Sequence, residues 1–214
     1  MGRGLSISFD LDGTLTSNRF VDSVWLYGLP GLVAERQKID FPAAQTMCIQ
    51  AYSGVGDGSL LWYRLPYWLE YFDLRDMDSK RLVSRYASHI ELYDDVIPVL
   101  KGLKDEGFDL ILFSNAARDF LDLEVSESGL EPFFSRIISV SDDWGMVKAE
   151  AAAYAKLRNT VSGNIVHIGD HKRFDYEVPM SAGITAYHIC RDKQPAANGC
   201  LHTLHQFAEI VRLL

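Results

Sequence analysis

The stretch Phe9-Asp10-Leu11-Asp12-Gly13-Thr14-Leu15-Thr16 places two carboxylates directly after an apolar run, Leu5-Ser6-Ile7-Ser8-Phe9. The run predicts a buried strand. Because residues i and i+2 of an extended chain point to the same face, Asp10 and Asp12 can reach one site. Two like charges so close repel each other unless a cation or a reacting group accounts for them. This stretch therefore predicts a chemical site at the end of the first strand.

Strands and helices alternate along the second half of the chain. Apolar runs predict strands over residues 108–113, 137–140, 164–168 and 184–189, with helices over 96–106, 119–128, 148–158, 175–182 and 203–213. This alternation is typical of α/β proteins with a mainly parallel sheet. We expect a Rossmann-like sheet that is covered by helices on both faces.

Residues 17–90 follow a different pattern, rich in aromatic residues that recur at helical spacing, as from Leu61 to Phe72. Gly28-Leu29-Pro30-Gly31, Asp40-Phe41-Pro42 and the glycine-rich stretch 53–59 are expected to divide this segment into about four helices. The sequence thus predicts two domains: an α/β core of residues 1–16 and 91–214, and a helical insert of residues 17–90 after the first strand.

The composition limits the partners of the protein. A formal net charge of −8 over 214 residues disfavours nucleic acid, which binds basic surfaces. No apolar run approaches the ~18 residues that indicate a membrane span, so no membrane partner is expected. The three cysteines, Cys48, Cys190 and Cys200, are widely spaced and odd in number. That pattern indicates unpaired thiols in a reducing compartment, hence the cytoplasm. The oligomeric state stays open.

Three more polar clusters come just after predicted strands. Ser114-Asn115 follows one strand, Lys148 follows the next after a short loop, and Gly169-Asp170 with Asp175 follows a third. Each cluster alone has an ordinary structural explanation: a helix cap, a surface charge or a turn. The carboxyl ends of parallel strands, however, meet at one edge of the sheet, where open α/β proteins bind ligands. Together with Asp10 and Asp12, the clusters indicate one site.

The order of these clusters resembles the haloacid dehalogenase (HAD) superfamily. Its first motif, Asp-x-Asp-Gly-Thr after a strand, is matched in full by Asp10-Leu11-Asp12-Gly13-Thr14. Its second is matched by Ser114, its third by Lys148 and its fourth by Gly169-Asp170 with Asp175, although Ala149 stands where many relatives have proline. The helical insert of residues 17–90 resembles the cap that this family calls type C1.

The resemblance implies a Mg²⁺-dependent phosphatase that hydrolyses a small phosphomonoester through an aspartyl-phosphate. Asp10 would be the nucleophile, and Asp12 would act as general acid and then general base. The other expected roles are phosphate binding by Ser114, Asn115 and Lys148, Mg²⁺ binding by Asp10, the Leu11 carbonyl, Asp12 and Asp170, and support for Lys148 or the ion's waters by Asp175.

Several alternatives stay open at this point. Asp12 favours a phosphatase over a 2-haloacid dehalogenase, since a halide leaving group needs no proton and the dehalogenating relatives lack this carboxylate. A phosphomutase, or a non-catalytic partner protein that binds phosphate or metal, also fits the motifs. In the insert, Arg19 and Arg64 are candidates to contact the remote end of the substrate. The alternative for both is an ordinary surface arginine.

Overall fold

The computed structural model describes residues 4–191 and 199–214, so residues 1–3 and 192–198 of the predicted core lie outside the described residues. Five parallel strands form one sheet in the order β3-β2-β1-β4-β5. The strands are β1 (Leu5–Phe9), β2 (Asp109–Ser114), β3 (Arg136–Ser139), β4 (Asn164–Gly169) and β5 (Thr185–His188). The prediction of a Rossmann-like parallel sheet is confirmed.

Strand β1 lies at the centre of the sheet, where the strand order reverses. Its last residue, Phe9, is in register with Leu112 of β2 on one side and Ile168 of β4 on the other. The chain therefore leaves β1, β2 and β4 at neighbouring points of the carboxyl edge. This is the place where open α/β sheets form their ligand sites.

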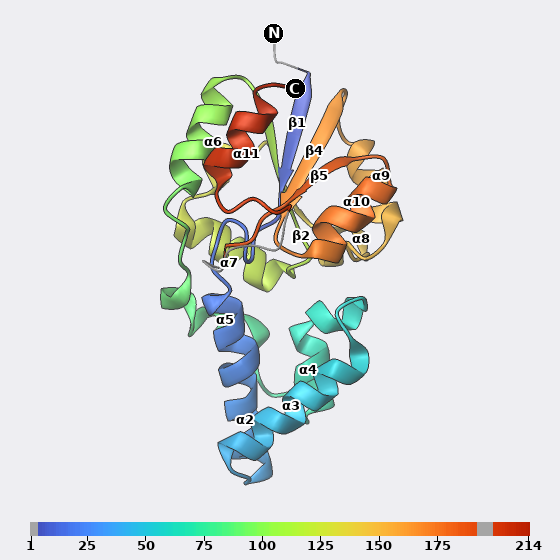
Figure 1. The fold of residues 1–214 in the computed structure, drawn as a ribbon. Coiled ribbons are helices and arrows are strands. Elements are labelled where there is room, and N and C mark those ends of the chain that lie inside the picture. The colour runs from blue at the N-terminus through green and yellow to red at the C-terminus, as the bar shows by residue number, and fades with distance from the viewer. Residues whose placement is uncertain (1–3, 192–198) are drawn as a thin grey trace.

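Helices cover both faces of the sheet (Figure 1). On one face, α6 (Val96–Asp105), α7 (Arg118–Ser128) and α11 (Leu204–Val211) bury apolar side chains against the strands. On the other face, α8 (Val140–Trp144), α9 (Ala151–Arg158) and α10 (Val178–Ser181) do the same. The π-helix η5 (Lys172–Glu177) leads into α10, and the 3₁₀ turn η4 (Glu131–Phe133) precedes β3.

Two element boundaries differ from the predicted ones because of local hydrogen bonds. The chain turns into α8 directly after β3, because the Ser139 hydroxyl accepts a bond from the Asp142 N–H at 3.2 Å and caps the new helix. Lys148 lies in the turn before α9 and not in the helix, since its backbone N–H donates to the Asn115 side chain at 2.8 Å.

The segment between β1 and α6 forms a helical body below the carboxyl edge of the sheet (Figure 1). Its elements are α1 (Arg19–Asp22), the π-helix η1 (Ser23–Gly28), α2 (Leu29–Gln37), α3 (Phe41–Val55), η2 (Leu60–Tyr63), α4 (Leu65–Tyr71), α5 (Ser79–Ser84) and η3 (Ala87–His89). We call residues 17–90 the cap. Thr16 and Leu92 form an antiparallel bridge where the chain enters and leaves it.

The expected helix break at residues 28–31 is wrong, because the helix continues from η1 into α2. Pro30 cannot donate to the preceding turn, and side chains of α3 serve carbonyls there: Gln45 donates to the Leu26 carbonyl at 2.7 Å and the Tyr52 hydroxyl to the Trp25 carbonyl at 3.1 Å. The N–H of Leu29 instead bonds to the carbonyl of Val24, which is the wider spacing of a π-helix. Gly28 serves packing, since a Cβ there would lie 2.8 Å from the Tyr86 ring.

The cap has an apolar core of its own, in which Phe20, Trp68 and Leu82 are almost fully buried. Phe120 of α7 belongs to this cluster and stacks on Trp25 with the ring centroids 5.5 Å apart. Helix α7 therefore contacts the sheet with one side and the cap with the other.

The cysteine prediction is wrong for two of the three residues. Cys190 and Cys200 form a disulfide, and Cys48 is free and buried in the cap. The pairing follows from a bridge between Ile189 and Leu201, which brings the two Cα atoms to 6.0 Å. Among the described residues, no helix is both long and apolar enough to cross a membrane.

Candidate active site

The loop after β1 holds both aspartates of the first motif. Asp10 is buried, and its Oδ2 accepts a hydrogen bond from the Thr14 hydroxyl at 3.2 Å. Gly13 has a φ of +74°, and a Cβ at this position would lie 2.2 Å from Oδ2 of Asp170. Only glycine allows this turn to come so close to the carboxylate that follows β4.

The Leu11 carbonyl is turned into this loop and not toward the cleft. It accepts backbone N–H groups from Thr14 at 3.1 Å, Leu15 at 2.8 Å and Thr16 at 3.1 Å, and the Thr16 hydroxyl at 3.3 Å. A carbonyl oxygen has two lone pairs, which these donors occupy. The structure thus does not present Leu11 to an ion, contrary to expectation, and the carboxylates remain as candidate ligands.

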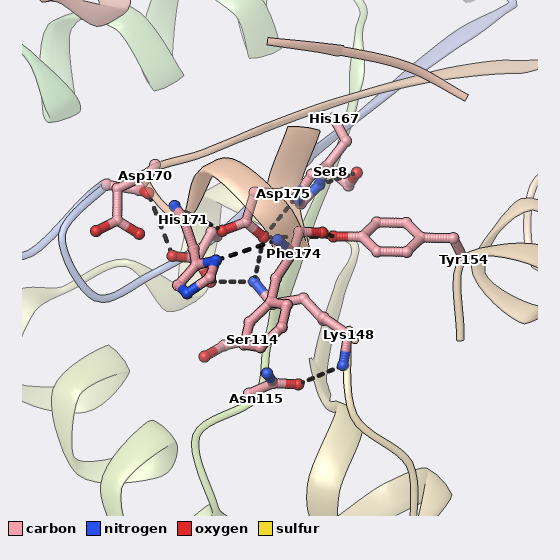
Figure 2. A network of polar contacts seen from close by, with 12 residues as sticks. Ser8, Ser114, Asn115, Lys148, Tyr154, His167, Asp170, His171, Phe174 and Asp175 are labelled. Atoms are coloured by element: carbon pink, nitrogen blue, oxygen red, sulfur yellow. Dashed lines mark hydrogen bonds and ion pairs between the residues drawn. The ribbon is translucent and has the colours of Figure 1, made fainter. Parts of the chain in front are cut away.

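Lys148 links the first motif to the fourth. Its side chain is 3% exposed, and its Nζ contacts Oδ1 of Asp10 and donates to Oδ1 of Asp175 at 2.6 Å (Figure 2). Burial lowers the pKa of Lys148, but the two carboxylates outweigh this effect and hold the pKa above its usual value. The lysine is therefore a fixed cation below the carboxyl edge.

Asp175 is held by several donors besides Lys148 (Figure 2). His167 lies 3.0 Å from its Oδ1 through Nε2, and the Tyr154 hydroxyl donates to the same oxygen at 3.3 Å. The His171 N–H donates to Oδ2 at 3.1 Å. Burial opposes ionisation of Asp175, but Lys148 and His167 hold its pKa well below the usual range. Asp175 is thus a permanent anion that orients the lysine.

The environment of His167 fixes its tautomer. Burial lowers the pKa of His167, so the ring is neutral. Because Asp175 can only accept, Nε2 carries the proton, and Nδ1 accepts from the Ser8 hydroxyl at 2.8 Å. The structure shows that this histidine lies directly behind the site.

Three acidic side chains in the cleft have raised pKa values. Burial raises the pKa of Asp10 to about 7, that of Asp12 to about 6 and that of Asp170 to about 8. Neighbouring carboxylates add to the effect at each of these groups. The site therefore concentrates negative charge that Lys148 alone does not balance.

These oxygens fit a divalent cation of the Mg²⁺ type. Ligand atoms of Asp10, Asp170 and Asp175 all lie within 4.8 Å of one another, although Asp175 already binds Lys148. Oδ1 of Asp12 is buried, with no hydrogen-bond partner among the described residues. Mg²⁺ prefers a few carboxylates and keeps several waters, which suits a hard oxygen set of this size.

Glu124 of α7 is a buried acid that sequence analysis missed. Its side chain is 0% exposed and lies against Asp12, so a hydrogen bond between the two carboxyls forms when one of them holds a proton. Burial and the adjacent Asp12 raise the pKa of Glu124 well above its usual value. Helical spacing places Glu124 among apolar neighbours such as Leu121 and Val125, so its position on the buried face was the available signal.

Ser114 and Asn115 lie at the end of β2, as expected. The Ser114 hydroxyl accepts the Ala116 N–H at 3.0 Å and can still donate its own proton. The Asn115 side chain accepts from the backbone of Lys148 and donates to the Tyr63 hydroxyl at 2.9 Å. Asn115 therefore ties the second motif to the third and to the cap. Tyr63 was missed because its role depends on a tertiary contact.

The site opens into a cleft of about 470 Å³ between the core and the cap. Asp10, Asp12, Asp170, Lys148 and the Ser114-Asn115 pair all line it. Arg19 and Arg64 do not: both side chains are exposed, and neither is among the lining residues. Arg19 begins α1 and Arg64 precedes α4. The structure does not bring these two arginines to the site.

A parallel α/β sheet with two aspartates in the loop after β1, a buried lysine and a further aspartate cluster under a helical cap defines the class as a capped α/β protein of the HAD type. The family model described as haloacid dehalogenase-like hydrolase matches residues 6–183. The chain belongs to this family.

Two solved structures and one curated protein illustrate the similarity. A HAD phosphatase from Thermococcus onnurineus is 25% identical, with a TM-score of 0.83 over 99% of this chain and 98% of that one. The L-2-haloacid dehalogenase of Xanthobacter autotrophicus, 18% identical, has a TM-score of 0.62 over 99% of each chain and shares the fold. The GMP/IMP nucleotidase YrfG of Escherichia coli K12 is 28% identical over 134 residues, which are 63% of this chain and 59% of that protein.

The metal-free protein should lose stability as the pH rises from about 5 to about 8. The pKa values of Asp10, Asp12 and Asp170 in the folded state, about 7, 6 and 8, exceed the ordinary value of 3.8, so the folded state binds more protons in this window. Asp175, with its lowered pKa, is ionised in both states there and adds no slope.

Mg²⁺ should therefore stabilise the protein more at the upper end of this window, because it binds ionised carboxylates. Thermal unfolding with EDTA and with Mg²⁺ at both pH values measures the difference, and Asp170→Asn should reduce it. Equal stabilisation at the two pH values would contradict the proposed metal site.

Replacing Glu124 with Gln or Leu should raise the free energy of unfolding. Leu removes the buried polar group and Gln removes its ability to ionise, and a buried polar group without full hydrogen bonding costs about 1–3 kcal/mol. The gain should be larger at about pH 8 than at about pH 5, because the raised pKa of Glu124 makes its ionisation increasingly unfavourable as the pH rises. Urea unfolding of both variants measures it. An equal loss of stability at both pH values would show that the carboxyl makes a favourable contact.

Proposed function

We propose that this protein is a Mg²⁺-dependent phosphatase that hydrolyses a small phosphomonoester through an aspartyl-phosphate on Asp10. The observation that carries the proposal is the contact of Lys148 with both Asp10 and Asp175 at the bottom of the cleft. A fixed cation beside the nucleophile keeps the carboxylate oriented, and it offers positive charge where a phosphoryl group would bind.

In the first step, a carboxylate oxygen of Asp10 forms a bond to phosphorus while the ester P–O bond breaks. The departing alkoxide takes a proton from the carboxyl of Asp12. Burial raises the pKa of Asp12 to about 6, which suits a group that must hold a proton near neutral pH and then release it.

In the second step, Asp12 takes a proton from water, and the water oxygen bonds to phosphorus. The bond between phosphorus and Asp10 breaks, so phosphate leaves and both aspartates return to their starting states. One pair of carboxylates thus performs transfer and hydrolysis in turn.

The remaining groups bind and orient the phosphate. The Ser114 hydroxyl and the Lys148 ammonium would contact its oxygens, and the Asn115 side chain holds the lysine backbone in position. Asp10 and Asp170, which have ligand atoms within 4.8 Å of each other, would hold Mg²⁺ and leave the Asp12 carboxyl free for proton transfer. When bound, the ion supplies positive charge that offsets repulsion between the carboxylates and the phosphate.

Two findings support a phosphatase among the reactions of the family. Asp12 is partly buried and its pKa is raised to about 6, so it can hold a proton that release of a halide would not use. In addition, a curated relative is a GMP/IMP nucleotidase, although the match covers only 59% of its length. We therefore propose a small phosphate ester as substrate.

Purified protein should release phosphate from small phosphate esters in the presence of Mg²⁺ and should lose this activity in EDTA. Asp10→Asn should abolish turnover, because an amide is not a nucleophile toward phosphorus. Phosphate release and halide release from 2-chloropropionate are measured in parallel. Halide release without phosphate release would show that the protein is a dehalogenase and not a phosphatase. Turnover by Asp10→Asn would show that Asp10 is not the nucleophile.

Asp12→Asn should lower kcat by roughly 10²–10⁴-fold, the usual contribution of a general acid or base. The loss should be greater for an alkyl phosphate than for 4-nitrophenyl phosphate, because nitrophenolate leaves without a proton. Isothermal titration with Mg²⁺ provides a control for metal binding. The same loss for both esters would show that Asp12 does not protonate the leaving group.

A further inference from the structure

The cap side of the cleft is lined by aromatic rings that pack on one another. Trp25 meets Tyr52 edge-on with ring centroids 5.8 Å apart, and Tyr52 meets Trp62 in the same way at 6.1 Å. Trp25 also stacks on Phe120 of the core helix α7, with only 7° between the ring planes. All four residues line the cleft. Because each ring is held by another, they form a preshaped aromatic wall.

Two carboxylates lie at this end of the cleft. Asp22 of α1 and Asp57 of the loop after α3 line it on the cap side. Among the described lining residues, Lys148 is the one lysine or arginine, and it is engaged by Asp10 and Asp175. His171 also lines the cleft and lies 3.5 Å from Asp57.

From this wall and this charge pattern we infer that the substrate's leaving alcohol carries a flat, uncharged aromatic ring. Such a ring can stack on Trp25 and Trp62, which are only partly buried and line the cleft. A second phosphate or carboxylate on the same alcohol would face Asp22 and Asp57, with no free cation among the described lining residues to neutralise it. Like charges at close range exclude such a substrate.

The size of the cleft agrees with this assignment. A volume of about 470 Å³ lies in the range of small-molecule sites, so it admits a phosphate together with a ring. The inference rests on the proposed phosphatase function and specifies its substrate class.

Three alkyl phosphates with closely similar leaving groups separate the effect of an aromatic ring from the effect of a negative charge. They are benzyl phosphate, cyclohexylmethyl phosphate and 4-carboxybenzyl phosphate. Their dissociation constants are measured by calorimetry on Asp10→Asn protein, and their kcat/KM values on the unaltered protein. Benzyl phosphate should bind at least about fivefold more tightly than cyclohexylmethyl phosphate, the lower end of what stacking on one aromatic side chain contributes. It should also bind more tightly than 4-carboxybenzyl phosphate.

Paired variants assign these preferences to the cap. Trp62→Leu should remove most of the preference for benzyl phosphate. Tyr27 is an aromatic residue of the cap that is 57% exposed and does not line the cleft, so Tyr27→Leu should leave the preference unchanged. Asp22→Asn and Asp57→Asn should each improve kcat/KM for 4-carboxybenzyl phosphate. Glu35 is an exposed acid of α2 that does not line the cleft, so Glu35→Gln should leave kcat/KM for this ester unchanged.

Two failures are distinguishable. If the unaltered protein hydrolyses all three esters with equal kcat/KM, or if Trp62→Leu and Tyr27→Leu behave alike, the aromatic substrate class is refuted and the phosphatase stands. If no ester is hydrolysed in Mg²⁺, the proposed function itself is refuted.

Discussion

A buried ammonium group between two carboxylates is the interaction on which the rest of the site depends. Lys148 is almost fully buried, and a cation in that position is stable only when anions accompany it. Asp175 supplies a permanent negative charge and is itself held by His167 and Tyr154. Asp10 shares the same cation, and both Asp10 and Lys148 line the cleft, so a substrate can meet the carboxylate and the cation together.

The fold was largely predictable because the polar clusters follow strands of a parallel sheet, whose carboxyl ends must meet at one edge. Details that depend on backbone direction were not predictable. The Leu11 carbonyl accepts hydrogen bonds from its own turn. A helix continues across Gly28 and Gly31, on either side of Pro30, where a break was expected. Contacts that depend on how the chain folds back also left no local signal, as with the disulfide between Cys190 and Cys200.

The roles of side chains in the cap were the hardest to predict. Arginines in a helical segment suggested anion recognition, but Arg19 and Arg64 are exposed, and the cleft presents rings and aspartates in their place. The cap reaches the motifs through the hydrogen bond between Tyr63 and Asn115, which joins residues far apart in the sequence. Burial and the adjacent Asp12 raise the pKa of Glu124 well above its usual value, which favours a protonated carboxyl directly beside Asp12.

The central claim is that the Asp10 carboxylate becomes phosphorylated during turnover. It is tested most directly by acid-quenching the protein during hydrolysis of an ester and mapping its peptides by mass spectrometry. The account predicts one added phosphoryl group on the peptide that contains Asp10, removed by hydroxylamine and absent from Asp10→Asn. Phosphate release at the full rate by the unaltered protein, with no phosphoryl group on this peptide in that protein or in Asp12→Asn protein, would contradict the account.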